Sequence, residues 1–289
     1  MATLRSRLCI ARTALSFGAL ALVSCGSSSP SNVATGDSTG GDSDERTGAQ
    51  YSLSIYVKGD TTAHTFTDGY SGQTPKNYFM GVTRFDLMLS AQDMNPVPVF
   101  DTGDVFTEMD MLSTTLAGTA RLIDIPPATY THGRVRLASL RADVDATVHL
   151  AGGGYSYATT GTVNAALADV TIDGTPRTKG WALFSASVPF VGPVSIETTL
   201  PPLPDNQGAT VVDDGTATWL VFEFLTPLVV DYHVTAAKKA TIIFDVYESF
   251  RWEELTTAGY TTGVFDVSQD GSFEPVHNFG ANSYSIQIE

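Results

Sequence analysis

Short runs in which apolar and polar residues alternate recur from residue 51 to the end of the chain, and they constrain the fold more than any other feature. In a β-strand successive side chains point to opposite faces, so this alternation is typical of strands that bury one face. The runs lie at 51–57, 85–89, 130–140, 144–150, 155–159, 181–190, 193–200, 218–225, 229–234, 240–247 and 283–288, with a short apolar run at 122–125. Helical periodicity is scarce, and we expect a short helix only at 248–258.

Turn signals separate these runs. Asp173-Gly174, Asp214-Gly215 and Asp270-Gly271 permit the positive φ angles of tight hairpins. The Pro-rich segment 200–204 should be an extended connector without strand pairing. We therefore expect an all-β fold over residues 51–289, an antiparallel β-sandwich with an elaborated second half. It forms either one large domain or two packed subdomains with a boundary near residue 150.

The N-terminus has the pattern of an export signal. Arg5, Arg7 and Arg12 accompany the uncharged, mostly apolar segment 13–24, which is shorter than the roughly 20 residues of a membrane-spanning helix. The sequence Leu22-Val23-Ser24-Cys25 resembles the lipobox of bacterial lipoproteins. The resemblance implies that residues 1–24 are a signal peptide and that Cys25 becomes the acylated N-terminus, carrying diacylglycerol and an amide-linked acyl chain such as palmitate. The alternative is an ordinary secretory signal with a chance cysteine.

The location that follows is a membrane surface. Gly26 after the cysteine implies, for a Gram-negative lipoprotein, export to the outer membrane, with a periplasmic or surface-exposed domain. Residues 25–50 would then be the lipidated cysteine and a flexible tether, because Ser, Gly, Thr and Asp dominate them. The expected partner is the lipid bilayer, bound through acylated Cys25.

Charge and cysteine content exclude several classes of protein. The 289 residues carry 16 Lys and Arg against 31 Asp and Glu, a formal charge of −15. An acidic chain with few basic residues is a poor partner for nucleic acid, because neutralising phosphates needs clustered Lys and Arg. Cys9 lies in the signal peptide and Cys25 before the domain, so residues 51–289 contain no cysteine and use neither a disulfide nor thiol chemistry.

One segment resembles a known family. Ile125-Pro126-Pro127-Ala128-Thr129-Tyr130 is similar to the hydrophobic-Pro-x-Gly-x-Tyr corner of transthyretin-like β-sandwich domains, with Ala128 in place of the usual Gly, and a strand follows from Arg134. With the stretches at 82–87 and 97–100, it looks like a family of bacterial lipoproteins of unknown function. The resemblance covers residues 51–150 at most. It implies a transthyretin- or immunoglobulin-like fold and a tether, and it implies no reaction.

Motifs for catalysis are missing from the sequence. There is no G-x-S-x-G elbow, H-E-x-x-H motif, phosphate-binding loop or G-x-G-x-x-G motif. The histidines lack metal-ligand spacing and are His64, His132, His149, His233 and His277. We therefore assign no catalytic residue and expect a non-enzymatic protein without a cofactor.

The one local candidate for a metal site lies near the C-terminus. Oxygen-bearing side chains stand at loop positions 1, 3, 5 and 9 around Gly271, and they belong to Asp266, Ser268, Asp270 and Glu274. This spacing resembles the start of a calcium loop, although His277 occupies position 12, where a bidentate Glu is expected. The alternative is an Asp-Gly hairpin turn with solvated acids.

Two further groups leave alternatives open. Four basic residues cluster within a short segment and form either a basic stripe or cross-strand pairs with acids: Arg121, Arg134, Arg136 and Arg141. The tryptophans either stack on sugar rings or pack in the core, and the apolar neighbours favour the core: Trp181, Trp219 and Trp252.

The sequence thus favours a membrane-anchored, non-enzymatic lipoprotein that acts as a binding or structural β-sandwich module, with a carbohydrate or a protein as the candidate ligand. The alternative is a glycan-directed lipoprotein hydrolase that uses dispersed carboxylates.

Overall fold

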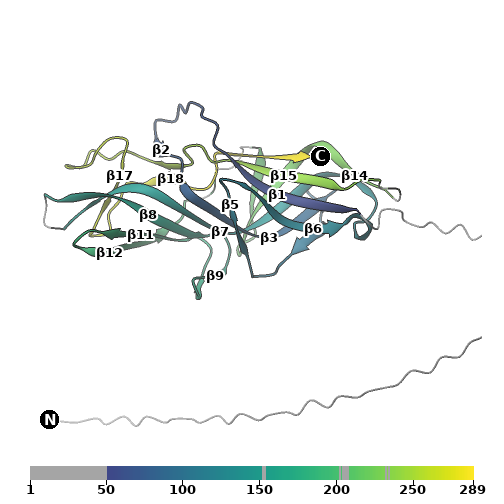
Figure 1. The fold of residues 1–289 in the computed structure, drawn as a ribbon, viewed down its shortest axis with the longest axis horizontal. Helices are drawn as coiled ribbons and strands as arrows, with labels where there is room; N and C mark the ends of the chain where they lie inside the picture. Colours follow the sequence, from purple (N-terminus) through teal and green to yellow (C-terminus); the bar gives the residue numbers. More distant parts are fainter. Residues whose placement is uncertain (1–50, 152–153, 202, 204–207, 232, 234) are drawn as a thin grey trace, which may run out of the picture. The chain divides into compact units, whose positions relative to one another are not determined.

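The computed structural model describes residues 51–289 except 152–153, 202, 204–207, 232 and 234. Strands dominate this part of the chain, and several sheets pack together around a shared apolar core (Figure 1). The prediction of an all-β sandwich is therefore confirmed. Within the described residues, no helix has the length and apolarity needed to cross a membrane.

The larger sheet is built around β7 (Ala128–His149), a strand of 22 residues. One edge of β7 pairs with β14 and then β8, and the other edge pairs with β3 and then β17. The sheet has ten strands: β3 (Lys76–Met88), β4 (Val97–Asp101), β5 (Thr107–Asp110), β7, β8 (Ser156–Ala166), β11 (Trp181–Val188), β12 (Gly192–Thr199), β13 (Ala209–Asp213), β14 (Thr218–Val230) and β17 (Phe265–Ser268).

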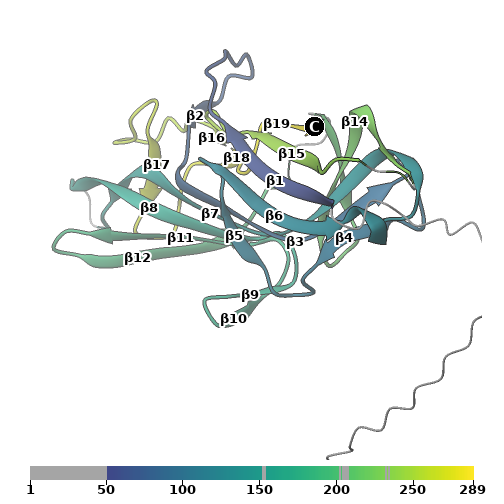
Figure 2. The ribbon, with the colours of Figure 1, turned by 45° about the vertical axis from the view of Figure 1, so that its right-hand side comes forward.

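The second sheet lies over the half of the larger sheet that contains β3, β4 and β14 (Figure 2). Its order is β19 (Ser283–Ile288), β15 (Lys238–Asp245), β1 (Ser52–Asp60) and β6 (Thr114–Arg121). The β1–β15 and β7–β17 pairs are parallel, so the sheets are mixed, whereas the sequence predicted antiparallel pairing. The strands β8, β11 and β12 extend to the other end of this part of the chain, where β17 also lies (Figures 1 and 2).

The core forms where alternate residues of the two sheets meet. Ile55 and Val57 of β1 are 0% exposed and stand beside Ala240 and Ile242 of β15, because the parallel register puts these pairs on one face. The larger sheet contributes a facing layer that includes Leu137 of β7. Each fully buried aliphatic side chain of this kind stabilises the fold by about 1.5–3 kcal/mol.

A small sheet replaces the helix expected at 248–258, and that prediction was wrong. β16 (Phe250–Trp252) lies between β2 (Ser71–Gln73) and β18 (Val276–Asn278). The alternation of Phe250 and Trp252 with Arg251 is the period of a strand, and tertiary pairing on both edges selects it. A separate β-hairpin joins β9 (Val170–Ile172) to β10 (Thr175–Arg177) through the expected Asp173-Gly174 turn.

Other boundaries differ from the predicted ones. Residues 122–124 form a 3₁₀ turn, Leu122–Asp124, in place of a strand. The runs at 130–140 and 144–150 belong largely to the single strand β7, whose residues 139–149 pair with β8. The runs at 218–225 and 229–234 are largely one strand, β14, with an irregularity between Glu223 and Leu228 that contains Pro227.

The corner before β7 has a specific hydrogen bond. The Tyr130 hydroxyl donates to the Pro126 carbonyl oxygen at 2.8 Å, and the Tyr130 side chain is buried. A buried hydroxyl with a backbone partner four residues upstream fixes the chain direction at the entry to the strand, as tyrosine corners do in β-sandwiches. Burial raises the pKa of Tyr130.

The clustered arginines are all paired with acids. Their ion pairs are Arg121–Asp124, Arg134–Asp86, Arg136–Asp104 and Arg141–Glu108. Arg134 and Asp86 pair across neighbouring strands, as one of the two alternatives predicted, whereas Arg121 pairs with an acid only three residues further along the chain. Trp219 and Trp252 are 9% and 1% exposed, which confirms core packing for both, and Arg134 lies over the Trp219 ring at 4.3 Å.

The Asp214-Gly215 turn joins β13 to β14 and holds a strongly hydrogen-bonded carboxylate. Asp214 accepts hydrogen bonds from the indole Nε1 of Trp219 at 2.8 Å and from the backbone amides of Thr216 and Ala217. Partial burial acts to raise the pKa of Asp214, but these donors outweigh it and lower the pKa to about 2.

In an NMR titration, we expect the Trp219 indole N–H resonance to report the protonation of Asp214, with a midpoint near pH 2. Because the pKa of Asp214 in the folded protein lies below its ordinary value of 3.8, ionised Asp214 stabilises the fold above about pH 4, and that stabilisation disappears as the pH falls toward 2. Urea unfolding at several pH values checks this. The difference between the wild type and Asp214→Asn should shrink across that window, and a constant difference would contradict the assignment.

Candidate functional site

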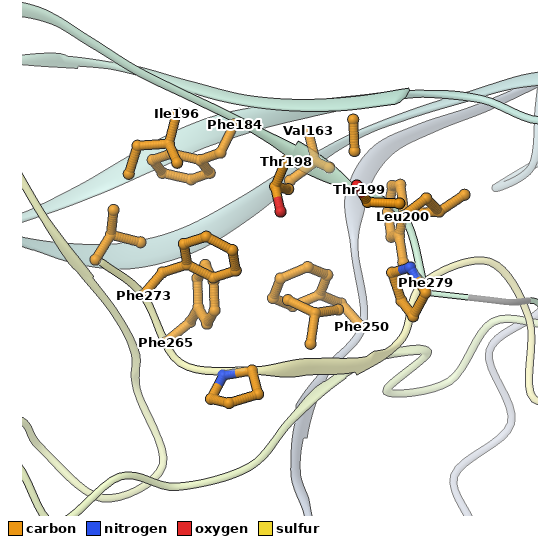
Figure 3. A pocket seen from close by; sticks show the side chains of 15 residues that line it. Val163, Phe184, Ile196, Thr198, Thr199, Leu200, Phe250, Phe265, Phe273 and Phe279 are labelled. Carbon is orange, nitrogen blue, oxygen red and sulfur yellow. The ribbon is translucent and has the colours of Figure 1, made fainter. Parts of the chain in front are cut away.

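An apolar cavity of about 260 Å³ lies between the β8–β11–β12 end of the larger sheet and the C-terminal segments β16, β17 and β18. Figure 3 shows rings and aliphatic side chains converging on it from both sides. Five phenylalanines line it: Phe184, Phe250, Phe265, Phe273 and Phe279. Among the residues that the structure describes, its lining includes no charged side chain.

The phenylalanine rings that form the walls of the cavity pack against one another. Phe184 and Phe265 make an edge contact with ring centroids 6.2 Å apart, and Phe265 and Phe250 make another at 4.9 Å. Phe250 continues the chain to Phe279 at 5.9 Å. Such edge-to-face pairs are favoured by the charge distribution of the rings. The walls are therefore preorganised by their own packing.

A glycine on β8 determines where the Phe184 ring lies. A Cβ atom at Gly161 would lie 2.3 Å from the Phe184 ring, so only glycine at this position lets the ring lie flat on β8. Across the cavity, Phe250 and Val276 reach inward because strand alternation sends their neighbours Arg251 and His277 to the opposite face.

The cavity reaches the surface beside the end of β12. Thr198, Leu200, Phe273 and Val276 line it and are only partly buried. The Thr198 hydroxyl points toward the phenylalanine rings (Figure 3). The site thus combines an apolar interior with a hydroxyl near its mouth, which suits a ligand that has an apolar body and a small polar end.

The residues predicted as a calcium loop form a hairpin turn. Ser268 and Ser272 pair across it, with the Ser268 amide donating to the Ser272 carbonyl oxygen at 2.7 Å, and Asp270 accepts from the Ser272 amide and hydroxyl. The Asp-Gly turn named as the alternative is therefore present.

Asp266 and Glu274, both 0% exposed, use their carboxylates inside the protein. Asp266 Oδ1 lies 2.6 Å from His149 Nε2, and Oδ2 accepts from the Thr261 amide at 2.7 Å. Glu274 accepts from the amides of Leu255 and Asp266. Burial raises the pKa of Glu274 against the lowering effect of these amides.

Among the described residues, no group of three or more His, Cys, Asp or Glu side chains is placed to hold a metal ion. Calcium at Asp266, Ser268, Asp270 and Glu274 stays a prediction, to be tested by the melts described in the Discussion. Cys25, the predicted lipidation site, lies outside the described residues.

Comparison with known proteins found no matching family model, no matching curated protein and no matching solved structure. The aromatic cavity itself was missed by sequence reasoning. The signal that could have indicated it is the presence of four phenylalanines between Phe250 and Phe279, in the last forty residues of the chain.

Proposed function

We propose that this chain is a membrane-tethered binding module, with a transthyretin-like sandwich that takes a compact, ring-containing apolar ligand into the phenylalanine-lined cavity. The observation that carries the proposal is a cavity of about 260 Å³ whose described lining has five phenylalanines and no charged side chain. An engineered apolar cavity of about 150 Å³ in another protein binds benzene, so this volume suits one or two fused rings.

The tether and the cavity together support a binding role. A lipid anchor at Cys25 would keep the module at a membrane surface, where apolar molecules concentrate. The edge-to-face phenylalanines favour an aromatic guest, because its ring can continue the same packing.

The hydrolase alternative has less support. Asp86, Asp266 and Glu274 are buried, and each accepts two or more hydrogen bonds from protein donors. A glycosidase needs two carboxylates that face a substrate, and no carboxylate of the described part of the chain lines the apolar cavity.

The test is the binding of N-phenyl-1-naphthylamine, a neutral aromatic probe whose fluorescence rises in apolar surroundings. A Cys25→Ser form of the full chain keeps acyl chains and detergent out of the assay. We expect saturable binding with a dissociation constant on the order of micromolar. Thr198→Trp places an indole at the mouth and should weaken binding at least tenfold.

Ser195→Trp is the matched control. Ser195 lies on the same strand with its side chain exposed on the opposite face, so the same substitution leaves the cavity open. Both variants should melt within a few degrees of the parent. Equal binding by parent and Thr198→Trp, or no saturable binding by the parent, would overturn the proposal.

A further inference from the structure

A second cavity, of about 430 Å³, lies on the opposite face of the small β2–β16–β18 sheet. Its lining comes from the 61–70 loop, the end of β15, the small sheet and the start of β19, and it comprises His64, Phe66, Asp68, Tyr70, Asp245, Arg251, His277, Asn278, Asn282 and Ser283. The 61–70 loop projects from the sheets beside β2 (Figures 1 and 2). This cavity is polar, and it is independent of the phenylalanine-lined one.

Its centre is a buried guanidinium. The Arg251 side chain is only 4% exposed, and it donates from Nε and Nη2 to the two oxygens of Asp68 at 3.0 and 2.5 Å. It also lies 3.7 Å from the centre of the Phe66 ring. Burial raises the pKa of Asp68, but the hydrogen bond from Arg251 leads the effects that lower it overall, so this carboxylate is a hydrogen-bond acceptor rather than a proton donor.

Two polar atoms of the lining are buried without a hydrogen-bond partner in the described chain. They are the donor Nη1 of Arg251, which lies 3.6 Å from a Glu248 oxygen, and the acceptor Oδ1 of Asn278. Their residues are 3% and 9% exposed. Buried polar groups are almost always hydrogen-bonded, so a donor and an acceptor that line one cavity without making hydrogen bonds indicate a ligand that offers both.

An apolar surface accompanies these polar groups. Tyr70 and His277 stack with ring centroids 3.9 Å apart and an angle of 17° between their planes, and both line the cavity. We propose that this cavity binds a neutral pyranose sugar. The sugar's C–H face packs on the Tyr70–His277 stack, and its hydroxyls bond Asp68, Arg251 and Asn278.

The charges of the lining favour a neutral sugar over an anionic or a cationic ligand. The lining carries the carboxylates of Asp68 and Asp245 and the guanidinium of Arg251, which disfavours an anion. A quaternary ammonium would use the rings and carboxylates, but it would leave the donor of Arg251 unsatisfied. A sugar hydroxyl both donates and accepts, so it satisfies both orphaned atoms.

The experiment is an NMR titration of the purified full chain with D-glucose, D-galactose and N-acetyl-D-glucosamine, and separately with tetramethylammonium. At least one sugar should shift the resonances of Tyr70, His277 and Asn278 with a dissociation constant on the order of 1 mM. Tyr70→Ala should weaken that binding about tenfold, and Tyr70→Phe should retain it, because the stacked ring is kept.

Tyr155→Ala is the control, since Tyr155 is 72% exposed and does not line the cavity. N-phenyl-1-naphthylamine binding should be unchanged in Tyr70→Ala, which separates this site from the apolar one. The inference is overturned if none of the three sugars shifts these resonances, if only tetramethylammonium does, or if Tyr70→Ala binds as tightly as the wild type.

Discussion

Replacing Asp86 with Asn should lower the free energy of unfolding by about 3 kcal/mol. Asp86 is 0% exposed, and its two oxygens accept from Arg84 Nε at 2.6 Å and Arg134 Nε at 2.7 Å. The amide removes the negative charge and leaves two guanidiniums facing one another in a partly buried site. For a domain of this size the melting temperature should fall by roughly 6–12 °C.

Asp101→Asn is the matched control. Asp101 pairs with the same Arg84 at 2.9 Å, but its side chain is 42% exposed, and solvent-exposed pairs contribute about 0–1 kcal/mol. Thermal melts of the two variants therefore show how much of the stability lost depends on the burial of the carboxylate rather than on ion pairing with Arg84 alone. Similar melting temperatures for both variants would show that the buried carboxylate does not stabilise the β3–β7 contact.

Much of the strand content could be predicted because alternation is a local property. Leu53, Ile55 and Val57 alternate with polar residues in the sequence, and the structure buries those three. Pairing of the clustered arginines, Arg134 among them, with acids on other strands was one of two alternatives. The choice depended on register, which places Asp86 directly opposite Arg134 on the neighbouring strand.

What could not be predicted depends on contacts between distant segments. The segment 248–258 was expected to be a short helix. Phe250 and Trp252 have the spacing of a strand, but the run is only three residues long, and its pairing with β2, far earlier in the chain, makes it a strand. Both cavities also form between segments that are far apart in the sequence. The apolar cavity lies between β8, β11 and β12 and the C-terminal segments, and the polar cavity lies between the 61–70 loop and the same C-terminal segments. Sequence periodicity shows which side chains share a face, but it does not show which faces meet.

The second large effect concerns the loop that was predicted to bind calcium. We expect Asp266→Ala to lower the free energy of unfolding by about 3 kcal/mol, because it leaves His149 Nε2 and the Thr261 amide without their buried acceptor. The loss should be the same in excess Ca²⁺ and in EDTA. Asp270→Ala, which removes an exposed carboxylate from the turn, should cost less than about 1 kcal/mol.

Thermal melts of the wild type under the same two conditions decide whether calcium has a role. A site that binds only the folded protein, at a hundredfold excess of metal over its dissociation constant, would add about 2.7 kcal/mol and raise the melting temperature by several degrees. We expect the curves to coincide. Calcium at Asp266 and Glu274 would have to compete with the imidazole of His149 and with the amides of Thr261, Leu255 and Asp266. A shift of several degrees that Asp270→Ala abolishes would show instead that the hairpin is a metal site and that these hydrogen bonds rearrange around the ion.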